Sequence, residues 1–235
     1  MDTTTTSVDD GLPEGEEKVR AVRAMFDTIA PRYDLVNRIM TFRMDVGWRR
    51  RAIRALDLGA RSVVVDLACG TGDMCIDLVD AGHRPIGVDL SFGMLAAART
   101  DAPLVHGDAL RLPFPDGSVD GVTCGFALRN FVSLPPMLEE LARILRPGGR
   151  VALLDVAEPP NPVMRLGHSV YFGRVVPLIG GLLSDKAAYR YLPKSVAYLP
   201  EPDELLGMIA SAGFGHVQRS LLSGGISQLY TATRA

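Results

Sequence analysis

The chain has 235 residues, 47% of them hydrophobic and 22% charged, which suits a single globular domain with a sizeable core. A formal net charge of −2 gives no basic surface, so nucleic acid is not an expected partner. The 3 cysteines include no Cys-x-x-Cys pair, which argues against zinc and against a disulfide framework. We therefore expect no metal, and buried thiols in a reducing cytoplasm. No apolar run reaches the roughly 18 residues of a membrane span.

The N-terminal part of the sequence is predicted to be a tail followed by helices. Residues 1–17 are polar, acidic and rich in threonine, which is typical of a disordered tail ahead of a single domain over 18–235. A helical region is expected from Glu16 to Ala55, interrupted at Pro31. Four arginines cluster after Trp48, and we interpret them as a solvated helix face rather than a phosphate-binding groove. They are Arg49, Arg50, Arg51 and Arg54.

Residues 63–73, with the sequence VVVDLACGTGD, are the most informative stretch of the chain. The three valines predict a strand buried on both faces. Gly70 and Gly72 allow backbone N–H groups to approach a ligand closely, where a Cβ atom would clash. A dinucleotide-binding loop would carry a third glycine, but Cys75 stands at that position, which disfavours a nicotinamide oxidoreductase. The loop predicts a site for a nucleoside without a pyrophosphate.

Two further apolar runs also end in carboxylates, Asp89 and Asp108. Together with Asp66 they would lie along one edge of a parallel sheet, where ligands of open α/β sheets bind. Asp89 follows Gly70 by 19 residues, close to the offset of about 20 expected for an acid that binds ribose hydroxyls. Asp108 is then expected near the base. The alternative is an unrelated domain in which these acids only cap helices.

The remaining elements complete a doubly wound pattern in which strands alternate with helices. Strands are expected near 62–66, 85–89, 103–106, 119–124 and 150–156. A proline-punctuated insertion follows at about 158–200 and would lie over the ligand-binding edge of the sheet. A helix over 203–212 and two strands over 216–222 and 226–233 end the chain. The Gly224-Gly225 hairpin is expected to place the last strand antiparallel between its neighbours.

The glycine loop, Asp89, Asp108 and the later Leu145–Arg150 turn occur in the order that resembles class I S-adenosylmethionine-dependent methyltransferases. The resemblance implies an α/β fold: a Rossmann-like seven-stranded sheet with an N-terminal helical region and a lid insertion after the fifth strand. It also implies S-adenosylmethionine as cofactor. The residues expected to bind it are Asp66, Gly70, Thr71, Gly72, Asp89, Leu90, Asp108, Ala109 and Gly125.

Four further blocks resemble one family, the menaquinone and ubiquinone biosynthesis C-methyltransferases. They are Phe26–Asn37, Gly125–Asn130, Tyr189–Ser195 and Leu222–Ile226. The resemblance implies methylation of a ring carbon of a demethylmenaquinol-type, prenylated quinol, which gives menaquinol and S-adenosylhomocysteine. Departures from the family pattern fall mainly on the acceptor side, so a different phenolic, polyketide or benzoquinol acceptor stays open. A non-catalytic nucleoside-binding module is the alternative from another class.

The resemblance also suggests residues for the acceptor side of the reaction. Arg129 is the candidate to stabilise a ring phenolate, because arginine stays protonated and cannot act as the base at neutral pH. Its alternative role is structural, in an ion pair with a lid acid. Asn130 could position the same hydroxyl or cap a helix. Tyr33, Asn37 and Tyr191 are candidate acceptor-binding residues, although aromatic side chains at helical spacing also fill cores. His168 is the one histidine considered as a base.

The predicted lid contains an apolar stretch, Val175–Leu183, that suits a prenyl tail and equally suits the core of a small lid. A membrane-dissolved acceptor would bring a cytoplasmic enzyme into peripheral contact with the inner face of the cell membrane. We also expect a homodimer.

Overall fold

The computed structural model of the protein describes residues 13–176, 178, 191 and 194–235. Most of the predicted tail lies outside the described residues, as do parts of the predicted lid at 177, 179–190 and 192–193. Helix α1 (Gly15–Ile29) begins inside the predicted tail. Residues 15–17 are therefore helical, and Glu16 and Glu17 suit the positive end of the helix dipole.

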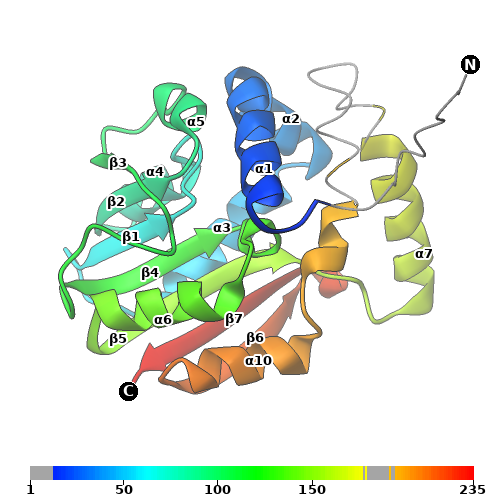
Figure 1. Cartoon of the computed structure of the whole chain (residues 1–235). Helices are drawn as coiled ribbons and strands as arrows, with labels where there is room; N and C mark the ends of the chain where they lie inside the picture. Colours follow the sequence, from blue (N-terminus) through cyan, green and yellow to red (C-terminus); the bar gives the residue numbers. More distant parts are fainter. Residues whose placement is uncertain (1–12, 177, 179–190, 192–193) are drawn as a thin grey trace, which may run out of the picture.

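Helix α1 is followed by α2 (Tyr33–Met40) and α3 (Met44–Leu56). A short 3₁₀ turn, Ala30–Arg32, separates α1 from α2, so the interruption expected at Pro31 is confirmed. Figure 1 shows α1 and α2 standing above one edge of the sheet, whereas α3 lies behind it.

Seven strands form one sheet in the order β3-β2-β1-β4-β5-β7-β6. The strands are β1 (Val63–Leu67), β2 (Arg84–Asp89), β3 (Leu104–His106), β4 (Val119–Gly125), β5 (Leu145–Val156), β6 (Phe214–Leu222) and β7 (Ser227–Arg234). The first five pair in parallel, and β7 pairs antiparallel with both β5 and β6. The predicted seven-stranded sheet and the predicted place of the last strand are therefore confirmed.

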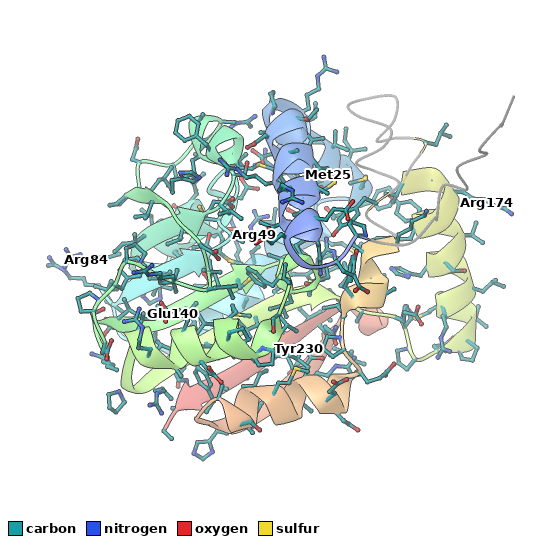
Figure 2. All side chains as sticks on the ribbon, viewed as in Figure 1. Met25, Arg49, Arg84, Glu140, Arg174 and Tyr230 are labelled. Atoms are coloured by element: carbon teal, nitrogen blue, oxygen red, sulfur yellow. The ribbon has the colours of Figure 1, made fainter. Side chains whose placement is uncertain are left out.

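The helices cover both faces of the sheet because successive strand residues point to opposite sides. In β1, Val65 and Leu67 pack in the core that includes α6 (Leu134–Ile144) and α10 (Pro202–Ser211). Val64 between them packs in the core that includes α3 and α4 (Asp73–Asp80). The largest fully buried side chain is Tyr230 of β7, which belongs to the α6 side (Figure 2).

The remaining described helices lie around the carboxyl edge of the parallel strands. Helix α5 (Phe92–Ala96) follows β2, and the short turn η2 (Leu128–Asn130) follows β4. Helix α7 (Pro162–Val170) follows β5 and continues into a π-helical turn, η3 (Tyr171–Val175), at the edge of the molecule (Figure 1). A last short turn, η4 (Val196–Tyr198), precedes α10. These segments surround the ends of β1, β2 and β4.

Strand β5 is longer than expected, because residues 145–149 extend it at its start. Leu145 pairs with Val119, and the pairing shifts before Gly121 meets Arg150. Gly148 has a φ of +78° within this irregular segment, a conformation that favours glycine. Among the described residues, no helix is long and apolar enough to cross a membrane.

Candidate active site

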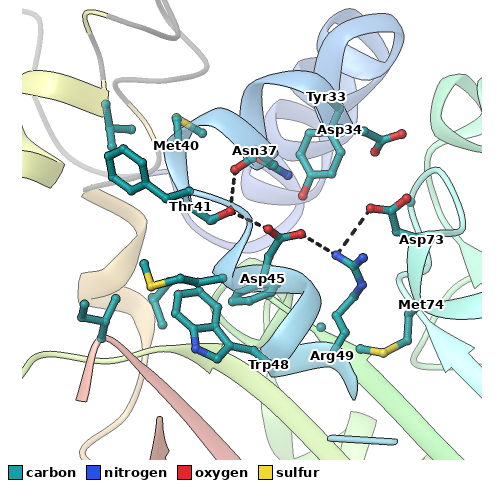
Figure 3. A pocket seen from close by; sticks show the side chains of 18 of the residues that line it. Tyr33, Asp34, Asn37, Met40, Thr41, Asp45, Trp48, Arg49, Asp73 and Met74 are labelled. Carbon is teal, nitrogen blue, oxygen red and sulfur yellow. Dashed lines mark hydrogen bonds and ion pairs between the residues drawn. The ribbon is translucent and has the colours of Figure 1, made fainter. Parts of the chain in front are cut away.

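Two adjoining cavities lie at the carboxyl ends of the parallel strands. The larger has a volume of about 400 Å³ and the smaller about 140 Å³. Their shared wall consists of Tyr33, Ala68, Gly70, Gly125 and Phe126. Figure 3 shows the Tyr33 side chain reaching into the larger cavity from α2. The two cavities therefore adjoin each other as two compartments of one candidate site.

The glycine loop forms the floor of this site. Gly70 has a φ of +56°, and a Cβ atom built on it would meet nothing within 4 Å, so open space lies directly above its backbone. Gly72 has a φ of +86°, but its Cβ atom would lie 2.5 Å from Thr100 Cγ2. Gly72 lines neither cavity. The positive φ and the close packing against Thr100 both require a glycine at this position.

Asp66, at the end of β1, lines the larger cavity and is almost fully buried. One carboxylate oxygen accepts a hydrogen bond from Thr123 Oγ1 at 2.8 Å, and the other accepts one from Cys75 Sγ at 3.5 Å. Burial raises the pKa of Asp66 to about 7, against the smaller opposing effect of these hydrogen bonds. A cation arriving at this position would favour the ionised carboxylate.

Asp89, at the end of β2, organises the smaller cavity. Its Oδ2 accepts the Gly70 N–H at 2.7 Å, and its Oδ1 accepts the Ser91 N–H at 2.8 Å. Each carboxylate oxygen has a second lone pair, so the group can still accept hydrogen bonds from a ligand hydroxyl. Three further residues predicted to bind the nucleoside line the same cavity: Leu90, Asp108 and Ala109.

Helix α1 covers the smaller cavity and is fastened at both ends. Val19, Val22, Arg23 and Phe26 line the cavity from this helix. Lys18 Nζ donates to the Phe131 carbonyl at 2.8 Å and lies 3.6 Å from the centre of the Tyr198 ring. Burial lowers the pKa of Lys18 to about 8.

At the other end of α1, Asp27 binds the start of α5. Its carboxylate accepts hydrogen bonds from Ser91 Oγ at 2.5 Å and from the Gly93 N–H at 2.9 Å. A Cβ atom on Gly93 would lie 2.9 Å from Asp27 Cα, so a residue without a side chain permits this approach. Neither of these two contacts was predicted from the sequence.

Arg129 lines the larger cavity and is buried. Its guanidinium forms an ion pair with Asp155, at the end of β5. It also donates to the Phe126 carbonyl at 2.8 Å and, through Nε, to Ser195 Oγ at 3.1 Å. The described ion-pair partner of Arg129 therefore comes from the sheet, and the part of the predicted lid at 179–190 lies outside the described residues. Three contacts fix the orientation of the guanidinium in the cavity wall.

The other acceptor-side candidates lie around Arg129. Tyr33 borders both cavities and Asn37 the larger one. Burial raises the pKa of Tyr33, with smaller opposing effects from a hydrogen bond to Asn37 and from the charge of Arg129. Asn130 lines the smaller cavity, and its Oδ1 accepts a hydrogen bond from Tyr191 Oη at 3.3 Å. Tyr191 therefore reaches the site through Asn130 and lines neither cavity.

The chain is similar to known proteins over most of its length. The sequence profile of the ubiE/COQ5 methyltransferase family matches residues 14–234. The chain belongs to this family. The demethylmenaquinone methyltransferase of Thermus thermophilus is 44% identical over 220 residues, which cover 89% of this chain and 100% of that protein. The ubiquinone/menaquinone biosynthesis C-methyltransferase UbiE of Syntrophotalea carbinolica is 40% identical over 222 residues, with 91% and 94% covered.

Solved structures of other proteins share the fold of this ubiE/COQ5 methyltransferase family member. A SAM-dependent methyltransferase of Thermotoga maritima superposes with a TM-score of 0.64 at 18% identity, covering 91% of this chain and 99% of that chain. The [4+2]-cyclase SpnF superposes with a TM-score of 0.65 at 14% identity, covering 94% and 96%. Since a cyclase shares the fold, the fold alone does not fix the reaction. The family match confirms the expected methyltransferase and its cofactor, S-adenosylmethionine.

The residues of this ubiE/COQ5 methyltransferase fit a cationic nucleoside cofactor. The Asp34 carboxylate lines the larger cavity, and its Oδ2 is buried without a hydrogen-bond partner among the described residues. Arg99 Nη1 lies 3.6 Å from that oxygen, and Thr71 donates its hydroxyl to the other one. Asp34 and Asp66 therefore give the floor two carboxylates for an ammonium group. Sequence reasoning missed Asp34.

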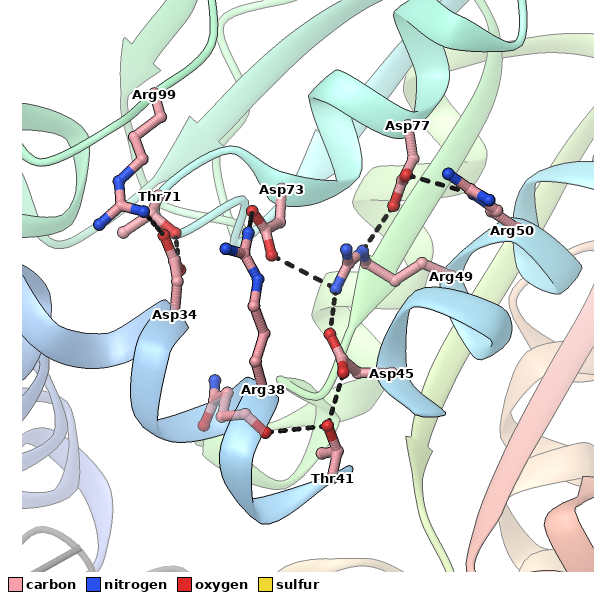
Figure 4. Close-up of polar contacts among 11 residues, drawn as sticks. Asp34, Arg38, Thr41, Asp45, Arg49, Arg50, Thr71, Asp73, Asp77 and Arg99 are labelled. Carbon is pink, nitrogen blue, oxygen red and sulfur yellow. Dashed lines mark hydrogen bonds and ion pairs between the residues drawn. The ribbon is translucent and has the colours of Figure 1, made fainter. Parts of the chain in front are cut away.

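A buried ionic network ties the N-terminal helices of the methyltransferase to helix α4 (Figure 4). Arg49 Nη1 lies 2.6 Å from Asp45 Oδ2 and 3.4 Å from Asp73 Oδ2, and its Nε lies 2.7 Å from Asp77 Oδ2. Arg38 binds the other oxygen of Asp73 at 3.0 Å. The network fixes α2 and α3 against the helix that starts at the glycine loop.

The interpretation of the arginine cluster as a solvated face was therefore wrong for Arg49, which is 9% exposed. It holds for Arg50, Arg51 and Arg54, which are exposed. Asp73 and Asp77 are four residues apart on one helix face. Two acids on one side of the helix after the glycine loop were the signal that could have predicted a buried cation.

His168 of α7 lines the larger cavity of the methyltransferase. Its ring lies 4.6 Å from the Phe172 ring, centre to centre. Its Nε2 is buried and has no hydrogen-bond partner among the described residues. Burial lowers the pKa of His168, with a smaller opposing effect from Glu158, so the neutral imidazole predominates near pH 7.

Proposed function

We propose that this methyltransferase transfers the methyl group of S-adenosylmethionine to a ring carbon of a demethylmenaquinol-type, prenylated quinol. The products are menaquinol and S-adenosylhomocysteine. The observation that carries the proposal is the shared wall of the two cavities, with the fixed guanidinium of Arg129 in the larger one. Relatives named demethylmenaquinone methyltransferase, matched over 89% of this chain and more, support the same acceptor.

The smaller cavity is the proposed nucleoside site. Asp89 would bind the ribose hydroxyls, and Asp108 lies in the same cavity wall for the base. Asp34 and Asp66 would hold the amino group of the methionine part. When bound, S-adenosylmethionine supplies a methyl group that its positive sulfur already activates. Gly125 borders both compartments, and a side chain there would meet Met74 Cε at 3.1 Å.

The larger cavity is the proposed site of the quinol ring. Arg129 stabilises the negative charge that develops on a ring hydroxyl oxygen, which makes the neighbouring ring carbon nucleophilic. Tyr33, kept neutral by burial, can donate a hydrogen bond to the acceptor. His168 is the proposed acceptor of the hydroxyl proton, because its buried Nε2 has no hydrogen-bond partner among the described residues and the ring is neutral near pH 7. On gaining the methyl group, the ring carbon would lose its own proton to the ring oxygen, which restores the aromatic quinol, and His168 would release its proton to solvent. Asn130, oriented by Tyr191, remains a positioning residue.

The test is methyl transfer to a panel of reduced acceptors, with products identified by mass spectrometry. The panel contains a demethylated naphthoquinol with a short prenyl chain, the same ring without the chain, a prenylated benzoquinol and a simple phenol. We expect fastest turnover of the prenylated naphthoquinol, with the methyl group on a ring carbon. Faster turnover of another compound in the panel would show that the acceptor belongs to that compound's class instead. Calorimetric binding of S-adenosylmethionine without any turnover would support a binding module instead.

Two further expectations are part of the same proposal. The acceptor carries a prenyl tail, so the enzyme would act in the cytoplasm in peripheral contact with the inner face of the cell membrane. A homodimer is expected in solution, which sedimentation velocity measures directly.

A further inference from the structure

Phe42 is held in an unusual position at the rim of the larger cavity. It lies in the turn between α2 and α3, where Phe42 and Arg43 have φ angles of +51° and +63°. Such left-handed conformations are uncommon for residues other than glycine. Phe42 is 71% exposed although it lines the cavity. The turn therefore keeps a large apolar side chain in solvent at the opening of the site.

Helix α7 lines the larger cavity on one side and exposes apolar side chains on another. Met164 and His168 line the larger cavity from one side. Val163, Leu166 and Val170 are spaced three and four residues apart and are 80%, 68% and 46% exposed. A surface helix of a globular protein normally turns such a stripe toward the core. No described residue of α7 is fully buried, so this stripe stays partly to largely exposed.

Phe42 and the α7 stripe lie at the same rim. Tyr171 directly follows α7, its hydroxyl donates to the Met40 carbonyl at 2.7 Å, and its ring lies 5.8 Å from the Phe42 ring. The end of α2 and the end of α7 are thus joined beside the cavity. We call Phe42, Val163, Leu166 and Val170 the apolar rim.

Arginines outnumber carboxylates around the apolar rim, where Glu158 lies just before α7. Between Pro159 and Val176 the sequence has two arginines, Arg165 and Arg174, and no carboxylate, although the whole chain has a net charge of −2. Arg43, next to Phe42, is also exposed. Figure 2 shows Arg174 extending outward beside α7. Exposed apolar side chains flanked by arginines are the composition of a helix that lies in the interface of an anionic membrane.

We propose that the apolar rim docks on an anionic lipid bilayer, so that the larger cavity opens toward the lipid. This assignment rests on the proposed function, because a prenylated acceptor dissolved in the bilayer could then reach the cavity without crossing water. The rim inserts shallowly, and Arg43, Arg165 and Arg174 contact the lipid phosphates. A partner protein is disfavoured, because the rim surrounds the opening through which the proposed acceptor must enter.

The test is flotation of the full chain with vesicles of phosphatidylcholine alone or of phosphatidylcholine with phosphatidylglycerol. We expect binding to the anionic vesicles that weakens with added salt. Phe42→Ser with Leu166→Ser should weaken it roughly tenfold or more. The matched control combines Phe92→Ser with Leu221→Ser, which are 63% and 43% exposed away from the rim, and should bind as the unchanged protein does.

Equal flotation of the rim variant and the control would overturn the proposal, and so would absence of binding to anionic vesicles. Self-association that disappears in the rim variant, without vesicle binding, would assign the rim to a second copy of the chain and also overturn it. Flotation needs no substrate, so its outcome is independent of whether the quinol panel shows turnover. Leu166→Ser with Val170→Ser should slow turnover of a long-chain quinol in vesicles and spare a short-chain quinol in solution.

Discussion

Arg129 and Asp155 form a buried ion pair that joins the turn after β4 to the end of β5. Asp155 has no exposed surface, and its Oδ1 also accepts the Val156 N–H at 2.8 Å. The acid comes from the centre of the sheet, whereas the guanidinium lies in the wall of the larger cavity. The core of the fold thus fixes the cation that we assign to the reaction.

Replacing Arg129 tests stability and catalysis separately. Arg129→Met leaves the Asp155 carboxylate buried and unpaired, which should lower the free energy of unfolding by about 3–5 kcal/mol. The double variant Arg129→Met with Asp155→Asn should regain most of that loss, because the amide oxygen can still accept the Val156 N–H. Urea denaturation measures both. Turnover should stay low in the stable double variant, and full activity there would remove Arg129 from the reaction.

Arg49 should be far more important to stability than its neighbour in the sequence. Arg49→Met would leave Asp45, Asp73 and Asp77 without their shared cation, at a cost of about 3–5 kcal/mol in unfolding free energy. Arg50 makes one long contact with Asp77 at 3.7 Å, and its side chain is 60% exposed. Arg50→Met should therefore change stability by about 1 kcal/mol or less. Similar urea midpoints for the two variants would contradict the network.

The affinity for S-adenosylmethionine should rise with pH through about 7. Burial raises the pKa of Asp66 to about 7, so the carboxyl is largely protonated at pH 6 and ionised at pH 8. A cationic ligand binds the ionised form better, so binding should release a proton near neutral pH. Calorimetry in two buffers of different ionisation enthalpy measures that proton.

Two substitutions check the assignment to Asp66. Asp66→Asn should abolish the proton release, since the amide does not titrate. Thr123→Val should shift the midpoint of the affinity change to higher pH, because the lost hydrogen bond favoured the ionised carboxylate. An unchanged profile in Asp66→Asn would place the titrating group elsewhere.

Lys18 should make the folded state more stable at high pH. Burial lowers its pKa from the ordinary 10.5 to about 8, so between these values the unfolded chain binds more protons than the folded one. The free energy of unfolding should therefore increase between about pH 8 and 10.5. Urea denaturation of the unchanged protein and of Lys18→Met isolates this contribution. Lys194→Met, at an exposed lysine, serves as the control. The increase of its unfolding free energy with pH should match that of the unchanged protein.

The sheet could be predicted because its signals are local. A run of β-branched residues ending in an acid fixes both the strand and the position of its end, as at Asp66 and Asp89. The order of the last two strands followed from the resemblance to a known fold and from the Gly224-Gly225 hairpin. The early start of β5 was not predictable. Leu145 pairs with Val119 ahead of a register shift, and the Gly-containing sequence there reads as a turn.

Residues that line the smaller cavity could be predicted from the sequence more fully than those that line the larger one. The residues that follow β1, β2 and β3 lie at the carboxyl edge of the sheet, where the ends of these parallel strands are neighbours. Asp34 and Arg49 form hydrogen bonds with partners that lie 37 and 28 residues further along the chain. The residues next to them in the sequence do not indicate which face of their helix is buried. An arginine-rich helix has the same local pattern whether one arginine points inward or all point outward.

The two cavities share part of their wall, and this offers a route to inhibitors. Tyr33 and Gly125 border both compartments. A compound that joins an adenosine to an aromatic ring is therefore expected to occupy both cavities at once. Its selectivity would come from the aromatic half, while the nucleoside half would anchor it.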